Sequence, residues 1–243
     1  LARSFSSLLD KLNSYTCFLE TVPRMLRHEI LNPVNTISMS LQNLQKTDGL
    51  QGNDESRDLT TAGNAIEQLQ LIVSSLTEAA NIDEALSQDE AEVFDIAALL
   101  DEYVGNSQRK HESAQLHYQG VPDGVFVKGN DIRIVQLLDK VKDNALDFAY
   151  PDTVILFQLD TDQADNAVIT IKNEGDSIPR QQLDTLFKGM VSHRSARTDT
   201  PHLGIGLYVA YQIAQFHQGQ LRIANRRDKQ GVEVVLVLPT VRK

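Results

Sequence analysis

Apolar residues in the first third of the chain recur at alternating steps of three and four, and this spacing constrains the fold more than any other feature. The first series is Leu8, Leu12, Tyr15, Leu19, Val22, Leu26, Ile30, Val34, Ile37, Leu41 and Leu44, and the second is Leu59, Ala62, Ile66, Leu69, Val73, Leu76 and Ala80. The spacing predicts two long amphipathic helices, the first ending near Thr47, where a Thr-Asp-Gly turn follows. Two antiparallel helices of this kind cannot bury a continuous seam alone. We therefore expect the hairpin to pair with a second copy as a dimeric four-helix bundle.

The first helix also carries a histidine, an acid and an amide close to a proline. At about 100° per residue, His28 lies on the face turned away from the apolar seam, and Asn32 follows one turn later on the same face. Pro33 removes a backbone donor and crowds the carbonyl of Glu29, so a bend is expected there. An exposed imidazole beside a carboxylate is suited to accepting a group from outside. A lone histidine on a helix is more often an ordinary surface residue than an acceptor of a transferred group. The motifs in the rest of the chain distinguish these two interpretations.

Residues 81–92 are acidic and polar, and we interpret them as a linker. After them the long helical spacing of apolar residues gives way to alternating strand and helix patterns. Expected helices follow at 96–106, at 131–149, in a short stretch ending near Phe187, and at 205–217, and expected strands at 115–119, 125–128, 154–160, 167–173, 220–224 and 232–238. Asp95 and Asp131 are plausible N-caps for the first two helices. Mixed strands and helices in this order predict an α+β fold, with helices on one face of a sheet. We divide the chain into domains at 1–88 and 89–243.

Composition excludes several function classes. The formal net charge is −10 and the isoelectric point is near 5.0, which argues against a nucleic-acid partner. Cys17 is the single cysteine, so no internal disulfide forms, and the chain fits a reducing compartment. No apolar run is long enough to cross a bilayer. The chain begins with Leu1 rather than Met, so we expect it to be a fragment with further sequence upstream.

A polar stripe is expected on the helix at 131–149. Lys140, Asn144 and Asp147 are spaced by four and three residues, so their side chains meet along one edge. An amide oxygen such as that of Asn144 is a hard ligand suited to Mg²⁺, which keeps waters and phosphate oxygens as its other partners. An ordinary solvated helix face is the simpler interpretation of the stripe taken alone.

Two glycine-bearing segments add chemistry of another kind. Asn173, at the end of a strand, offers both a donor and an acceptor to a heterocycle edge, and Gly175 permits close backbone approach, although a tight turn also satisfies this sequence. Gly204 and Gly206 let amide N–H groups converge at a helix N-terminus, where the helix dipole stabilises a phosphate. Val209 stands where a dinucleotide-binding fingerprint needs its third glycine, and no Walker lysine-serine pair is present.

A polar stretch without periodicity lies between Phe187 and Leu203. It contains the cationic or titratable residues Lys188, His193, Arg194, Arg197 and His202. Its length and composition predict a lid whose cations neutralise phosphate.

Taken together these segments resemble the sensor histidine kinases of two-component signalling, over residues 15–239. The matching segments are the His-Glu-x-x-Asn-Pro phosphoacceptor box at 28–33, the asparagine box at 131–149, the first glycine box at 173–179, the phenylalanine box at 186–190, the second glycine box at 204–207 and the final strand at 231–239. Each box is weak alone. Together, in the family's order and spacing, they are a specific signal.

The resemblance implies a dimerisation and phosphotransfer hairpin followed by a Bergerat-type ATP-binding domain. His28 is then the phosphoacceptor, Glu29 the acid that takes the ring proton, and Asn32 the residue that orients a water for dephosphorylation of the regulator. The phosphoryl group passes to an aspartate of a response regulator receiver domain. The resemblance also implies a homodimer on the cytoplasmic side of a bacterial inner membrane, with a sensor or membrane segment upstream.

The nucleotide site that the resemblance implies takes ATP and Mg²⁺. Asn144 would hold Mg²⁺, Asn173 and Gly175 would meet adenine, and the turn at 204–207 would cradle phosphates. The implied cofactor-binding residues are Lys140, Asn144, Asp147, Asn173, Gly175, Ile178, Phe187, Arg194, Arg197, Gly204, Gly206 and Leu207.

Several residues depart from the family pattern. Lys140 stands where another asparagine is common, Asp147 where a basic residue is common, and Asn173 in place of the usual aspartate. His202 and Gln218 replace glycines, and we expect them to stiffen the hinge of the lid.

These departures leave alternatives open. One is a nucleotide-binding phosphatase with little autokinase activity. Another is a dimeric scaffold whose ATP domain is degenerate and acts only by docking partners. A chaperone- or topoisomerase-type ATPase is disfavoured, since it leaves the helix around His28 unexplained.

Overall fold

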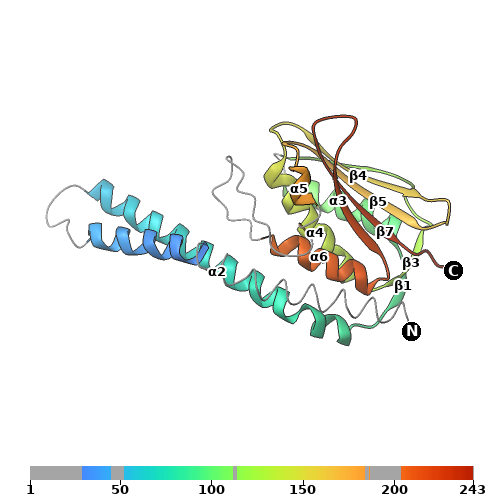
Figure 1. Cartoon of the computed structure of the whole chain (residues 1–243), viewed down its shortest axis with the longest axis horizontal. Coiled ribbons are helices and arrows are strands. Elements are labelled where there is room, and N and C mark those ends of the chain that lie inside the picture. The colour runs from blue at the N-terminus through green and yellow to red at the C-terminus, as the bar shows by residue number, and fades with distance from the viewer. Residues whose placement is uncertain (1–28, 45–51, 112–113, 184–185, 187–203, 243) are drawn as a thin grey trace. The chain divides into compact units, whose positions relative to one another are not determined.

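The computed structural model describes residues 29–44, 52–111, 114–183, 186 and 204–242 (Figure 1). The described residues form two compact units: the first contains those up to Ala80 together with residues 204 and 205, and the second contains the rest, from Asn81 onward. His28, Phe187, Arg194 and Arg197 lie outside the described residues, as do the first part of the first expected helix and the expected lid. The predictions made for them stay predictions.

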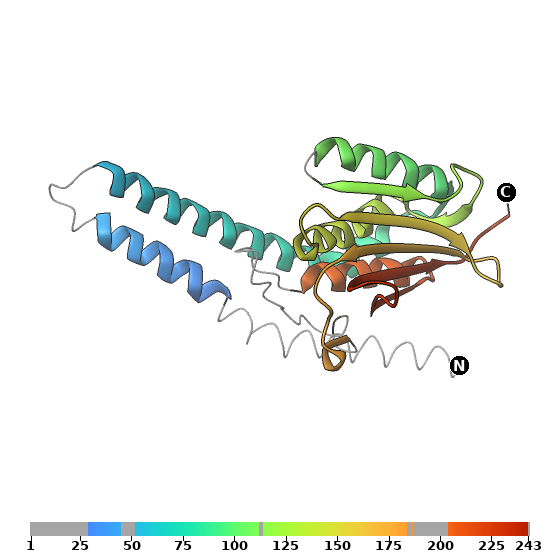
Figure 2. The ribbon, with the colours of Figure 1, turned by 90° about the horizontal axis from the view of Figure 1, so that it is seen from above.

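The first unit contains an antiparallel helical hairpin, as the apolar spacing predicts. Residues 29–44 are helical and run alongside α2 (Gly52–Gln88), and the Nδ2 of Asn43 donates to Oδ1 of Asp58 at 3.5 Å (Figures 1 and 2). The residues of α2 buried in this unit are mostly small: Ala62, Ala65, Ile72 and Ala79. Three larger residues of the expected seam, Leu59, Ile66 and Val73, are instead 60%, 46% and 57% exposed. The single chain therefore buries only part of the apolar surface of its hairpin.

The linker expected at residues 81–92 is mostly wrong. Helix α2 continues to Gln88, and only residues 89–91 separate it from strand β1 (Glu92–Asp95). Ile82 and Leu86, one helical turn apart, are both buried. Their burial sustains the helix through a segment whose acidic composition suggested a break.

The second unit is an α+β fold, as predicted. Its main sheet has five strands in the order β2-β4-β5-β7-β6, in which β2 and β4 are parallel and the other neighbours antiparallel. These strands are β2 (Gln115–Gln119), β4 (Val154–Thr161), β5 (Ala167–Glu174), β7 (Gly231–Leu238) and β6 (Gln220–Asn225). Strand β1 pairs with β3 (Phe126–Gly129) in a separate two-stranded sheet. Strand β1 was not expected from the sequence.

Three helices cover one face of the main sheet (Figures 1 and 2). They are α3 (Ile96–Lys110), α4 (Asp131–Phe148) and α6 (Ile205–Phe216), and a short helix, α5 (Arg180–Leu183), follows β5. Asp95 caps α3 as predicted, since its carboxylate accepts from the N–H groups of Ala97 and Ala98. The cap of α4 is Asn130 and not Asp131, which lies in the first helical turn.

The core lies between this sheet and these helices. Along β5 every second residue is buried, in the series Ala167, Ile169, Ile171 and Asn173. This alternation is the ordinary pleat of a strand with one covered face. The amide of Asn173 is therefore on the helix-covered face, at the end of an otherwise apolar row.

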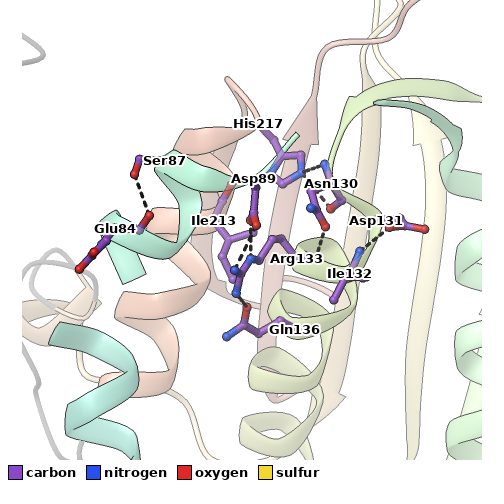
Figure 3. Close-up of polar contacts among 10 residues, drawn as sticks. All are labelled: Glu84, Ser87, Asp89, Asn130, Asp131, Ile132, Arg133, Gln136, Ile213 and His217. Carbon is purple, nitrogen blue, oxygen red and sulfur yellow. Dashed lines mark hydrogen bonds and ion pairs between the residues drawn. The ribbon is translucent and has the colours of Figure 1, made fainter. Parts of the chain in front are cut away.

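A polar cluster joins the end of α2, the start of α4 and the end of α6 (Figure 3). The guanidinium of Arg133 donates to both carboxylate oxygens of Asp89, Nε at 2.5 Å and Nη2 at 3.2 Å. The N–H of Asn130 donates to Nε2 of buried His217 at 2.9 Å, and Nδ1 of His217 donates to the carbonyl oxygen of Ile213 at 2.8 Å. The cluster fixes the N-terminal turn of α4 against its neighbours within the second unit.

We expect the stability of the protein to fall below about pH 6.5 through His217. Burial lowers the pKa of His217 below its ordinary 6.5, and the hydrogen bonds with Ile213 and Asn130 and the charge of Asp89 offset this only in part. The unfolded chain therefore binds a proton more readily than the folded one. This contribution to stability is complete above the unfolded-state pKa and is lost as the pH falls through the folded-state pKa.

Urea unfolding at pH 7.5 and pH 5.5 measures this effect. The wild type should lose more stability between the two pH values than His217→Gln, which cannot titrate. The matched control is His117→Gln, at an exposed position of β2, which should keep the wild-type difference. Equal losses in the wild type and in His217→Gln would contradict the prediction.

Gln218 was expected to stiffen the hinge of the lid, but it lies at the C-terminal end of α6 instead. It directly follows the end of α6 with a φ of 54°, and the N–H of Gly219 donates to the carbonyl oxygen of Ala214 at 2.8 Å. This is the left-handed position that closes a helix, where glycine is the usual residue.

None of the described helices combines the length and apolar content that crossing a bilayer requires.

Candidate functional site

Asn173 is the most unusual polar residue in the second unit. The residue is 5% exposed, and its Nδ2 is the one buried side-chain nitrogen or oxygen among the described residues that has no hydrogen-bond partner. A buried donor left unpaired costs about 1–3 kcal/mol. Such a group in a folded protein is commonly explained by a ligand or a water that it binds.

Gly175 brings the end of β5 against the end of α4. Ala149, which caps α4, pairs with Gly175 in an isolated bridge, and the N–H of Tyr150 donates to the carbonyl oxygen of Glu174 at 2.7 Å. A Cβ on Gly175 would lie 2.1 Å from the carbonyl oxygen of Phe148, which is too close for any other residue at this position. The glycine is thus required by the close approach of the chain's own backbone at Phe148.

The loop after Gly175 is held by residues that the sequence analysis missed. The amide of Asn225, at the end of β6, accepts from the N–H of Ile178 and donates to its carbonyl oxygen, both at 2.7 Å. The hydroxyl of Tyr150 donates to Oδ1 of Asp176 at 2.7 Å. Asn225 ends a strand far along the sequence, and the pairing of β7 with both β5 and β6 places that strand end near the loop. No local pattern signals this contact.

The predicted stripe on α4 is present as expected from helical spacing. Lys140, Asn144 and Asp147 are all partly exposed. A Cβ built on Gly206, in the first turn of α6, would lie 3.7–3.8 Å from the side chain of Lys140. The stripe and the start of α6 are therefore neighbours, although they are far apart in the sequence.

The second glycine segment opens a helix, as predicted. Gly204 has a φ of 66°, in the region that favours glycine, and it directly precedes α6. Leu207 is buried and anchors the first turn of the helix in the core.

The donors on α4 fit a cation held mainly by phosphate oxygens. Within the described part of the chain, no group of three or more His, Cys, Asp or Glu side chains is arranged to hold a metal ion. Asn144 offers one neutral oxygen from a partly exposed position. A single amide ligand is adequate for Mg²⁺ only when phosphate oxygens of a bound nucleotide and waters supply the other ligands.

The surroundings of the predicted phosphoacceptor are described from Glu29 onward. Glu29 and Pro33 are buried, and Asn32 is exposed as expected for the outward face. The helix continues beyond Pro33, and the hydroxyl of Thr36 donates to the carbonyl oxygen of Asn32 at 3.1 Å.

Two family models match the chain. One, described as "His Kinase A (phospho-acceptor) domain", matches residues 21–85. The other, described as "Histidine kinase-, DNA gyrase B-, and HSP90-like ATPase", matches residues 129–242. They correspond to the helical hairpin and to most of the α+β unit, and they agree with the predicted fold class.

Relatives of known type include sensor proteins and sensor histidine kinases. The sensor protein ChvG of Agrobacterium fabrum is 24% identical over 238 residues, which is 93% of this chain and 39% of ChvG. The sensor histidine kinase WalK of Bacillus subtilis is 23% identical over 215 residues, covering 87% of this chain and 35% of WalK. The chain thus spans less than half the length of these two relatives.

Solved structures share the fold. The histidine kinase AdeS of Acinetobacter baumannii superposes with a TM-score of 0.64 and 18% identity, over 88% of this chain and 98% of AdeS. The mycobacterial sensor histidine kinase MprB has a TM-score of 0.53 and 21% identity, over 63% of this chain and all of the MprB structure. With a phosphoacceptor hairpin and a kinase-type ATPase domain in this order on one chain, the protein belongs to the sensor histidine kinases of two-component systems.

Proposed function

We propose that this chain autophosphorylates His28 from ATP and passes the phosphoryl group to an aspartate of a response regulator receiver domain. In this proposal residues 1–88 form the dimerisation and phosphotransfer domain, and residues 89–243 the ATP-binding domain. The observation that carries the proposal is the order of the two family matches on one chain. Regulator dephosphorylation, assisted by exposed Asn32, is the second activity that we propose.

The chemistry assigns separate tasks to the chain's own residues. The neutral imidazole of His28 attacks the γ-phosphorus of ATP, so that an N–P bond forms and the bond to the bridging oxygen of ADP breaks. Glu29 takes the proton that the ring loses. The buried amide of Asn173 and the close approach at Gly175 hold the base, while Lys140 and the first turn of α6 bind phosphates.

Asn144 would hold Mg²⁺ together with the phosphate oxygens. The cation, when bound, supplies positive charge that neutralises the phosphates. Of the other predicted nucleotide contacts, Asp147 and Ile178 lie in the second unit. Phe187 ends the expected short helix, and Arg194 and Arg197 belong to the expected lid.

A homodimer follows from the apolar surface of the hairpin. Leu59, Ile66 and Val73 recur every seven residues on α2 and are largely exposed in the single chain. A second hairpin that covers this stripe completes a four-helix bundle. We also propose that the chain works on the cytoplasmic side of an inner membrane as part of a longer sensor protein, since ChvG and WalK extend well beyond the region that matches it.

Incubation of the purified chain with γ-labelled ATP and Mg²⁺ tests the proposal. We expect label that is stable in alkali and lost in acid, since a phosphohistidine has this stability. A chain that binds ATP and never becomes labelled would support the phosphatase-biased alternative. A chain that binds no nucleotide would support the degenerate scaffold.

A further inference from the structure

The last two turns of α2 have a composition that disfavours the end of a helix. Asp83 and Glu84 lie within these turns, Asp89 directly follows the helix, and residues 81–92 contain no lysine or arginine. The C-terminal end of a helix carries partial negative charge, so acids at this end destabilise it. A cation that offsets them has to come from another element of the fold.

Arg133 supplies this cation from α4 (Figure 3). Its guanidinium donates to both carboxylate oxygens of Asp89, and its Nη1 also donates to Oε1 of Gln136 at 3.0 Å. Arg133 lies in the first turn of α4, where the partial charge of the helix end is positive and disfavours a cation. The pair of Asp89 and Arg133 therefore offsets an unfavourable charge at the end of each helix.

The pair is shielded from water, and the segment before it depends on the second unit. The side chains of Arg133 and Asp89 are 22% and 16% exposed, so the loss of one partner leaves the other charge poorly solvated. Ile82 and Leu86 are buried, and residues 81–88 belong to the second unit although they continue the helix of the hairpin. Their helical state therefore depends on contacts made within the second unit.

We propose that the Asp89–Arg133 pair is a latch that keeps residues 81–88 helical, and that opening the latch turns residues 81–91 into a flexible tether. With the latch closed, only residues 89–91 lie between α2 and β1. With the latch open the tether is longer, and the reach of a flexible chain grows with the square root of its length. The latch thus sets how freely the ATPase domain moves relative to the hairpin. This inference is independent of the proposed function, since neither side chain of the pair has to contact a nucleotide.

Hydrogen exchange of the full chain, followed by mass spectrometry, tests the latch at the amides of residues 84–88. Arg133→Gln should lower the protection of these amides about tenfold. Asp89→Asn is the sharper test, because it removes an acid from the C-terminal end of a helix. Without a latch this change should leave protection unchanged or raise it. With a latch it should lower protection about tenfold, since Arg133 loses its partner.

Controls separate the latch from general effects of charge and from global unfolding. Glu90→Gln removes the adjacent, exposed acid and should keep protection within about twofold of the wild type. The amides of β5 should stay as protected in every variant as in the wild type. Digestion with a glutamate-specific protease is a second measurement, and it should cut Asp89→Asn after Glu84 about tenfold faster than the wild type. Should Arg133→Gln fail to fold, Arg133→Lys keeps the charge without the two-pronged contact and should give a smaller fall.

The outcomes either support the latch or overturn it. A fall in protection that is confined to residues 84–88, and to the variants at Asp89 and Arg133, supports it. Unchanged or raised protection in Asp89→Asn overturns it. An equal fall in Glu90→Gln also overturns it, because the loss of any acid would then have the same effect. A matching fall in β5 would mean that the whole unit opens and that no local latch exists.

Discussion

Replacing His28 by glutamine is expected to reduce the transfer of phosphate from ATP to the chain to background, a loss of at least about a thousandfold. Glutamine is polar and similar in reach, so the outward face of the helix keeps its character. Its amide nitrogen has no lone pair free to attack phosphorus, because that pair is delocalised into the carbonyl. The measurement is acid-labile, alkali-stable label on the purified protein after incubation with γ-labelled ATP and Mg²⁺.

The matched control for this prediction is His117→Gln. His117 is exposed on β2, in the ATP-binding unit, and we assign it no role in the reaction. This variant should become labelled at the wild-type rate. Both variants should bind ATP like the wild type, which shows that the lost label reports chemistry and not nucleotide affinity. Persisting label in His28→Gln would place the phosphoacceptor elsewhere and remove the basis for the proposed transfer to a regulator.

The regular elements of the second unit were largely predictable from the sequence, since their hydrophobic periods are local. The strand expected at 115–119 has those bounds in the structure, and the helix expected from residue 205 begins there. The alternation from Ala167 onward placed Asn173 on a strand, and its burial follows from the same period of two. Local patterns of this kind need no knowledge of the tertiary structure.

Long-range contacts account for what the sequence did not predict. Strand β1 exists because Glu92–Asp95 pairs with Phe126–Gly129, a partner that no local pattern identifies. Lys142 is buried although lysine is ordinarily exposed, and its ammonium is paired with Asp139 at 2.9 Å. In the candidate site, the unpaired Nδ2 of Asn173 and the clamp from Asn225 depend on which strand ends and helix ends meet. The strand order of the sheet determines which of these ends lie close together.

Replacing Asn144 by alanine is expected to abolish the gain in ATP affinity that Mg²⁺ provides. Asn144 is partly exposed on the polar stripe of α4, one turn after Lys140, whose side chain lies beside Gly206 at the start of α6. The described residues include no cluster of acids or histidines able to take over a metal ion. Removing an outer-shell partner already lowers metal affinity about 10- to 100-fold, and removing the ligand itself should cost at least as much.

Calorimetric binding of a non-hydrolysable ATP analogue, in Mg²⁺ and in EDTA, measures this gain. The wild type should bind the analogue more tightly in Mg²⁺, whereas Asn144→Ala should bind it equally in both. In EDTA the two proteins should be alike, because the base contacts at Asn173 are unchanged. Asp143→Ala is the matched control, since it alters the adjacent, exposed position of the same helix and removes a negative charge. A variant at Asn144 that keeps the full gain would show that another residue holds the cation, and the polar stripe of α4 would then be the solvated helix face that the simpler interpretation supposed.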